Sequence, residues 1–226
     1  MRKSAERDPR LLNRVVTAGD ARRLAWAGLG LAVFGLSALV ARSGEVPEAE
    51  QAVFRWVNGL PNVLSAPMQI TQLLGILGVG PIVAAVALIL RLPRLAVAAL
   101  AVTLLKLAAE RVVWYVLDIS RARPGVTEPV VVVRGNAPAT GAGFVSGHVV
   151  LVTGLAWIVT PYLRGRWRIV PWIVVALVSL ARVYLGAHNP LDVVGGLGLG
   201  TAIGAGVALA LRLPGPRKRR EPGVGA

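Results

Sequence analysis

The chain has 226 residues, of which 55% are hydrophobic, and it carries a net charge of +14 without a single cysteine. The mean hydropathy of +0.65 and the long apolar runs exclude an ordinary soluble domain of this size. The lack of cysteine excludes disulfides, thiolate nucleophiles and cysteine-based metal sites. Because the basic residues cluster at the ends of apolar runs, the charge indicates a membrane protein and not a nucleic-acid partner.

The first third of the chain predicts a tail, a membrane span and a surface helix. Residues 1–21 are polar and basic, so we expect a cytoplasmic tail. The apolar run at about 22–40 is longer than the hydrophobic region of a signal peptide, which favours a retained first span. Residues 43–61 carry apolar side chains at helical spacing, which predicts an interfacial helix, with a solvated loop as the alternative.

Five further apolar runs follow, at about 66–90, 95–117, 146–163, 169–185 and 191–213. Glycines and Pro81 interrupt the first of these, which predicts either a kink or a division into an interfacial piece and a span. The last is rich in glycine, which permits close helix approach. We therefore predict an all-α fold, a six-span helix bundle over 22–213 whose motif-bearing core is 95–200, followed by a basic cytoplasmic tail at 214–226.

The basic residues also predict the orientation in the cell membrane. With six spans, both termini and the turns at 91–94 and 164–168 share one side, which then holds 17 of the 25 lysines and arginines. The positive-inside rule makes that side cytoplasmic. The polar residues of interest then fall at the extracytoplasmic ends of the spans.

His188 and Asp192 are the first candidates for chemistry. Asn189 is a good helix N-cap and Pro190 suits the first helical position, so the sixth span is expected to begin there. Asp192 in the first turn can then accept a hydrogen bond from the His188 imidazole and leave the other ring nitrogen nucleophilic. Arg182, in the last turn before Gly186, offers a planar fork for a phosphate.

The second candidate stretch is Ser146-Gly147-His148 at the start of the fourth span. Ser146 is a plausible N-cap, Gly147 lets an anion approach free backbone N–H groups, and His148 can protonate a leaving oxygen. Arg123 precedes this stretch, and Lys106 and Arg111 on the third span can face the same centre. Because arginines surround the histidines, a metal site is disfavoured and an oxyanion site is favoured.

These residues resemble the signature of the type 2 phosphatidic acid phosphatase superfamily, the lipid phosphate phosphatases. Its third motif, Ser-Arg-x5-His-x3-Asp, matches at Arg182, His188 and Asp192, with Ala181 in place of serine. Its second, Pro-Ser-Gly-His, matches at Ser146-Gly147-His148, with Val145 in place of proline.

The first motif of that family, Lys-x6-Arg-Pro, is matched only at Arg123-Pro124, since Val116 stands where the lysine belongs. Lys106 or Arg111 can fill the role through an insertion, and the residues do not choose between them. The resemblance covers about 95–200 and includes the six-span layout.

The resemblance implies a metal-independent and cofactor-free hydrolase acting through a phosphohistidine. His188 would be the nucleophile, Asp192 would orient it, and His148 would protonate the leaving group. The residues that would hold the phosphoryl oxygens are Arg123, Arg182, Ser146 and Gly147, with Lys106 or Arg111. The implied partner is a membrane lipid phosphate such as a polyprenyl diphosphate, phosphatidate or phosphatidylglycerol phosphate. The alternatives are a lipid phosphotransferase using the same histidine, and a degenerate membrane protein that binds anionic lipids; the sequence indicates no oligomeric state.

Overall fold

The computed structural model describes residues 17–119, 121–128 and 130–214, so the expected tails at 1–21 and 214–226 lie almost wholly outside the described residues. The described part is helical and contains no strand beyond one isolated bridge between Ala122 and Ala142. The all-α prediction is therefore confirmed for the described residues. The α-helices of the described part are α1 (Ala18–Ala41), α2 (Glu48–Asn58), α3 (Ser65–Gln72), α4 (Val79–Ile89), α5 (Pro93–Tyr115), α6 (Pro124–Thr127), α7 (Gly147–Val159), α8 (Val170–Tyr184) and α9 (Pro190–Ala210).

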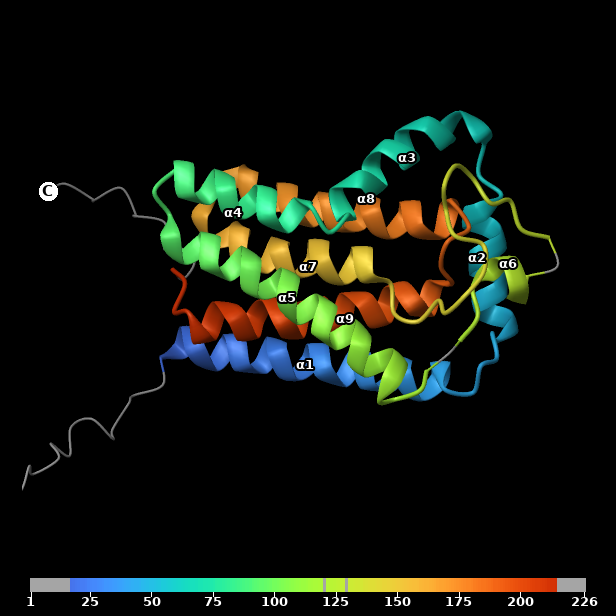
Figure 1. Cartoon of the computed structure of the whole chain (residues 1–226), viewed down its shortest axis with the longest axis horizontal. Coiled ribbons are helices and arrows are strands. Elements are labelled where there is room, and N and C mark those ends of the chain that lie inside the picture. Colours follow the sequence, from blue (N-terminus) through green and yellow to red (C-terminus); the bar gives the residue numbers. More distant parts are fainter. Residues whose placement is uncertain (1–16, 120, 129, 215–226) are drawn as a thin grey trace, which may run out of the picture.

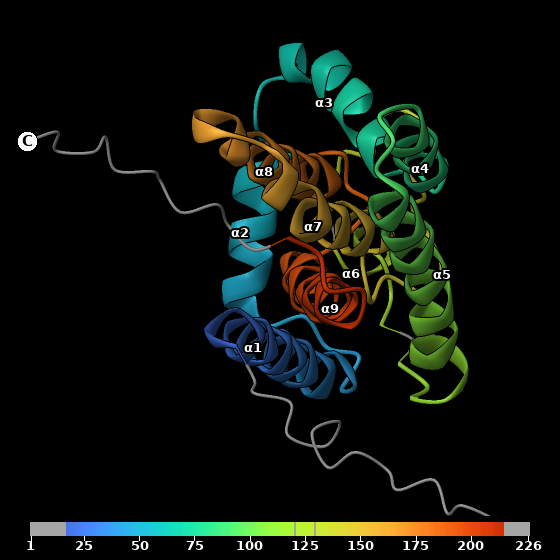
Figure 2. The ribbon, with the colours of Figure 1, turned by 90° about the vertical axis from the view of Figure 1, so that its left-hand side faces the viewer.

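Helix α7 forms the centre of the bundle. Ten of its 13 residues are buried, and in the end view it lies among α5, α8 and α9 (Figure 2). Its apolar face packs against α5 and the end of α9 in a cluster that includes Val102, Leu151, Leu155 and Ile158. Because α7 is enclosed on several sides, the residues at its amino-terminal end are held firmly in place.

Helices α1 and α9 approach each other at their backbones. A Cβ atom added to Gly30 would lie 2.6 Å from the carbonyl oxygen of Gly198, and one added to Gly198 would lie 2.7 Å from the backbone nitrogen of Phe34. Side chains larger than hydrogen do not fit at these points, as is typical of membrane helix pairs. The prediction of close approach holds for most of the α9 glycines, whereas Gly206 faces open space.

The expected second span is broken. Helix α3 and the 3-10 turn Leu73–Gly75 meet α4 at an angle of 64°. The two alternatives that the sequence left open were a kink and a division, and both descriptions fit this sharp bend. A Cβ on Gly75 would lie 2.8 Å from the Cβ of His148, so the break allows the chain to pass directly over the start of α7.

The number of spans is not decided by helix length and hydropathy. Among the described helices, three are long and apolar enough to cross a membrane, and the bent pair of α3 and α4 makes a fourth. Helix α5 is long enough, but it carries Lys106, Glu110 and Arg111, and the apolar helix that begins at Gly147 is short. The described residues accordingly form an all-helical structure with helices long and apolar enough to span a membrane, and six spans remain a prediction.

The two ends of the bundle differ in composition. The start of α1, the turns at 91–94 and 164–168 and the end of α9 all lie at one end, on the left of Figure 1. Helices α2 and α6 and the long loop before α7 cover the other end. Helix α2 confirms the expected helix after the first span: Phe54 and Val57 are buried, whereas Val53 and Trp56 are 50% and 72% exposed.

Candidate active site

A cavity of about 420 Å³ lies between α5, the break before α4, and the starts of α7 and α9. We call it the histidine cavity because both histidines of the chain line it. Six of the nine residues that the sequence singled out line it: Lys106, Arg123, Gly147, His148, Arg182 and His188. The topology therefore brings together residues that are up to 82 positions apart in the chain.

His188 lies in the short turn between α8 and α9 and is 3% exposed. Its Nδ1 is 3.6 Å from Oδ2 of Asp192, and its Nε2 is 3.3 Å from Nη1 of Arg123. Burial, reinforced by the positive charges of Arg182 and Arg123, holds the pKa of His188 well below the usual value for histidine. The imidazole is therefore neutral at neutral pH and keeps a free electron pair on one ring nitrogen.

Asp192 is fully buried behind His188 and is held from three directions. The backbone N–H of Asn189 donates to its Oδ2 at 2.9 Å, and Nη1 of Arg121 donates to its Oδ1 at 3.4 Å. The backbone carbonyl of Asp192 in turn accepts from the N–H of Ser146 at 3.1 Å, which joins the starts of α7 and α9. The position of this carboxylate is therefore set by the fold and not by His188.

Arg121 links Asp192 to helix α2. It donates to both carboxylate oxygens of Glu50, at 3.0 and 2.5 Å, and to the carbonyl of Glu45 at 3.1 Å. Oε1 of Glu50 also accepts the backbone N–H of Leu191 at 2.8 Å. Although burial alone would lower it, the carboxylates of Glu50 and Asp192 raise the pKa of Arg121. This guanidinium thus pairs with two carboxylates, those of Glu50 and Asp192, that the fold withdraws from water.

The start of α7 has an unsatisfied hydroxyl and an open backbone. Ser146 occupies the expected N-cap position, but its side chain makes no capping bond, and its buried Oγ has no hydrogen-bond partner among the described residues. A Cβ on Gly147 would collide with Oε1 of Glu110 and lie 3.0 Å from Cε of Lys106. A side chain at this position would displace the ends of Glu110 and Lys106, and the helix terminus itself is a ready anion site.

The two arginines of the histidine cavity are fixed by different partners. Nη1 of Arg123 donates to the carbonyl of Ala187 at 2.6 Å, beside His188. Arg182, 3% exposed in the last turn of α8, donates to the amide oxygen of Gln72 at the end of α3, and its Nε has no partner among the described residues. Both guanidinium groups keep donors for an anion.

Lys106 and Arg111 occupy different environments. Nζ of Lys106 lies 2.8 Å from Oε2 of Glu110, and both side chains line the histidine cavity. Arg111 is exposed and does not line it. Of the two candidates for the missing lysine of the first motif, only Lys106 is therefore in reach of a ligand bound between the histidines.

Three contributors to this site were not foreseen from the sequence: Arg121, Glu50 and Gln72. The available signal for Arg121 was its place two residues before Arg123, in a loop that enters the bundle. Glu50 lies in a polar segment where a solvated carboxylate is the ordinary expectation, and Gln72 in an apolar run. Only the fold places these side chains within reach of the motif residues.

Comparison with known proteins identifies the family. A sequence profile described as the PAP2 superfamily matches residues 94–213, which is more than half of the chain. The chain belongs to the PAP2 superfamily. This confirms the resemblance drawn from the motifs.

Individual relatives agree with this assignment. A lipid A 4'-phosphatase of Porphyromonas gingivalis is 37% identical over 65 residues, a match that spans 27% of each chain. The crystal structure of Aquifex aeolicus LpxE superposes with a TM-score of 0.62 at 20% identity, covering 72% of this chain and 96% of that one. A transmembrane PAP2 type phosphatidylglycerolphosphate phosphatase from Bacillus subtilis gives a TM-score of 0.52 at 21% identity, covering 79% of this chain and 94% of that one. At these identities the two structures show a shared fold.

We predict that Arg121→Leu destabilises the protein strongly. Removing the guanidinium leaves the buried carboxylate of Asp192 and the partly buried carboxylate of Glu50 without this cation, which costs about 3–5 kcal/mol in the free energy of unfolding. The measurement is reversible unfolding in mixed micelles. Arg111→Leu, which removes an exposed arginine from α5, is the matched control and should change this value by less than about 0.5 kcal/mol. Equal losses in the two variants would contradict the assigned role of Arg121.

Proposed function

We propose that the chain hydrolyses a phosphate ester or diphosphate of a membrane lipid through a covalent phosphohistidine on His188. The observation that carries the proposal is the placement of one buried imidazole between a carboxylate and a guanidinium. Its Nδ1 faces Asp192 and its Nε2 faces Arg123 in the histidine cavity. A hydrogen bond from Nδ1–H to Asp192 leaves the Nε2 electron pair directed at the place where Arg123 would bind a phosphate.

The separation of 3.6 Å between Nδ1 and Oδ2 exceeds a normal hydrogen bond. Catalytic hydrogen bonds are often long before substrate binds and shorten in the complex. A developing positive charge on the imidazole would draw it toward the Asp192 carboxylate. The buried carboxylate thus stabilises the charged ring that forms during attack.

The proposed reaction has two displacement steps. In the first, Nε2 of His188 forms a bond to phosphorus, the bond from phosphorus to the leaving oxygen breaks, and protonated His148 gives its proton to that oxygen. In the second, His148 accepts a proton from water, the resulting oxygen bonds to phosphorus, and the bond from Nε2 to phosphorus breaks. Inorganic phosphate leaves, and both histidines return to their starting states.

The phosphoryl oxygens would be bound by donors that the free protein leaves open. Arg123 and Arg182 supply guanidinium N–H groups, the start of α7 supplies backbone N–H groups at Gly147, and Ser146 supplies its unpartnered hydroxyl. Such donors stabilise charge that develops on equatorial oxygens during phosphoryl transfer. Lys106 adds a further cation on the side of α5.

A metal-independent reaction fits this lining. Among the described residues, no three histidine or acidic side chains are grouped to hold a metal ion. The cationic groups Lys106, Arg123 and Arg182 surround the histidines and would repel a divalent cation. Their charge takes the role that a metal ion has in other phosphatases.

A lipid substrate is supported by the apolar wall of the histidine cavity. Leu73 and Ile76, at the break between α3 and α4, line it and are 53% and 43% exposed, and Trp114 lines it from α5. A phosphate at the histidines would place its apolar substituent along this exposed wall, where bilayer chains are expected. The names of the relatives point to lipid A and phosphatidylglycerolphosphate, so both belong in the substrate panel beside polyprenyl diphosphates and phosphatidate.

An extracytoplasmic site is supported by the distribution of charge along the bundle. The basic turns at 91–94 and 164–168 lie at the end away from α2 and α6. Under the positive-inside rule this end is cytoplasmic. The histidine cavity, at the starts of α7 and α9, then opens toward the outer side.

We predict that His188→Ala abolishes release of inorganic phosphate from this panel in detergent, with a loss of about 10³-fold or more in kcat. Activity of the wild type should survive a chelator. Arg164→Gln, at the other end of the bundle, controls for activity lost during purification in detergent and should retain full activity. Wild-type turnover by His188→Ala would refute the covalent mechanism, and transfer of labelled phosphate to an added lipid alcohol would identify a phosphotransferase.

We predict that Lys106, and not Arg111, contributes to phosphate binding. Lys106→Met should lower kcat/KM by roughly 10- to 100-fold, as expected for losing one charge-assisted contact. Arg111→Met should change it by less than about twofold, because the side chain is exposed away from the histidine cavity. A larger loss in Arg111→Met than in Lys106→Met would contradict the assignment.

A further inference from the structure

A second cavity, of about 510 Å³, lies at the opposite end of the bundle from the histidine cavity. It is formed by the start of α1, the end of α7, the start of α8 and the end of α9. We call it the tryptophan cavity. Its aromatic and basic lining consists of Trp26, Trp157 and Trp172 with Arg22, Arg23 and Arg168. None of these residues belongs to the catalytic scheme.

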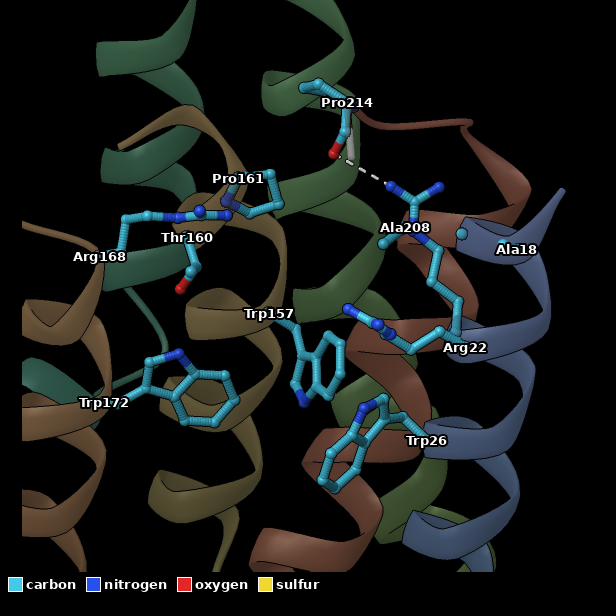
Figure 3. Close-up of a pocket in the computed structure, with 12 residues that line it drawn as sticks. Ala18, Arg22, Trp26, Trp157, Thr160, Pro161, Arg168, Trp172, Ala208 and Pro214 are labelled. Carbon is cyan, nitrogen blue, oxygen red and sulfur yellow. Dashed lines mark hydrogen bonds between the residues drawn. The ribbon is translucent and has the colours of Figure 1, made fainter. Parts of the chain in front are cut away.

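The three indoles form a connected wall. The ring centroids of Trp26 and Trp157 are 5.8 Å apart, as are those of Trp157 and Trp172. Figure 3 shows Trp157 between the other two, so that rings from α1, α7 and α8 follow one another along the cavity. The indole nitrogen of Trp157 is buried and has no hydrogen-bond partner among the described residues. Tryptophans of this kind are typical of the level of lipid headgroups.

The arginines of the tryptophan cavity are not equivalent. The guanidinium of Arg23 already has partners within the protein. Its Nη2 donates to the carbonyls of Leu213 and Pro214 at 2.5 and 3.0 Å, and its Nη1 lies 3.8 Å from Oδ1 of Asp20. Within the described part of the chain, neither Arg22 nor Arg168 has an ion-pair or hydrogen-bond partner. Figure 3 shows these two arginines on opposite sides of Trp157. Two guanidinium groups that have no partner among the described residues thus flank an apolar aromatic wall.

We propose that the tryptophan cavity binds an anionic glycerophospholipid of the membrane leaflet opposite the histidine cavity. The phosphodiester would lie between Arg22 and Arg168, and the glycerol and upper acyl chains would lie against the indoles. A small soluble anion would leave the aromatic wall without a contact, whereas a lipid uses both the charge and the wall. The volume suits a headgroup and the first part of the chains and not a whole lipid.

The position of the tryptophan cavity in the bundle is consistent with a bound anionic lipid. The tryptophan cavity lies at the end that carries the basic turns, where the anionic lipids of the cytoplasmic leaflet are attracted by arginines. Basic pockets between membrane helices on this side are a recurring type of anionic-lipid site. The proposal does not depend on the covalent mechanism, because it concerns a separate cavity and binding without turnover.

The test is lipid binding to the full chain in detergent, measured by native mass spectrometry during titration with dioleoylphosphatidylglycerol or dioleoylphosphatidylcholine. All proteins carry His188→Ala, so turnover plays no part. Two double variants are compared. The first combines Arg22→Gln with Arg168→Gln, and the second, the matched control, combines Arg164→Gln with Arg166→Gln. The control removes the same charge from the same end of the bundle through exposed arginines that do not line the tryptophan cavity.

We expect the parent and the control to bind the phosphatidylglycerol roughly tenfold or more tightly than the phosphatidylcholine, and the Arg22/Arg168 variant to lose that preference. Single substitutions at Arg22 and at Arg168, each expected to weaken binding in part, keep the test valid if the double variant does not fold. Equal binding of the two lipids by the parent, including the case in which a terminal segment of the chain fills the cavity, would overturn the proposal. So would equal losses in the two double variants.

Discussion

The proposed catalytic end of this bundle depends on one buried carboxylate, that of Asp192. Asp192 lies in the first turn of α9, where the backbone of Asn189 and the guanidinium of Arg121 hold it behind His188. A carboxylate buried alone would take up a proton and lose its use as a partner for an imidazolium. The guanidinium of Arg121 opposes this, and its ion pair with Glu50 ties α2 to the start of α9. The surface helix α2 is therefore part of the architecture of the site, although no residue of α2 lines the histidine cavity.

Much of the site follows from local sequence, since its main residues lie at helix starts with recognisable signals. Asn189 and Pro190 mark the start of α9, which places Asp192 one turn in, and the spacing from Arg182 to His188 spans a single turn between helices. The same reasoning does not find Arg121, Glu50 or Gln72, because their partners are far away in the chain. It also leaves Lys106 and Arg111 equivalent, since only the packing of α5 against α7 decides which side of the helix faces Gly147. The break at Leu73–Gly75 was foreseen as a glycine-rich interruption, but its role in covering His148 depends on tertiary contact.

The two cavities lie at opposite ends of the bundle and differ in their lining, as the two ends differ in basic residues. The histidine cavity combines cations with two imidazoles at the end covered by α2 and α6, and the tryptophan cavity combines arginines with indoles at the end of the basic turns. The same chemical pair, a guanidinium beside an apolar surface, suits an amphipathic phosphate at either end. What separates them is the proposed nucleophile: of the two cavities, the histidine cavity alone contains an imidazole, and a carboxylate lies behind it. The proposal therefore assigns turnover to one leaflet and retention of lipid to the other.

The central claim is that the phosphoryl group passes through His188. Its most direct test is rapid quenching of the wild-type enzyme with a phosphorus-labelled lipid phosphate, followed by denaturation in alkali and mass spectrometry of the peptides. We predict a labelled phosphoryl group on the imidazole of His188 during turnover, and its disappearance when the substrate is exhausted. A phosphoryl group on any other residue, or steady turnover with no label on the protein at any quench time, would contradict the account.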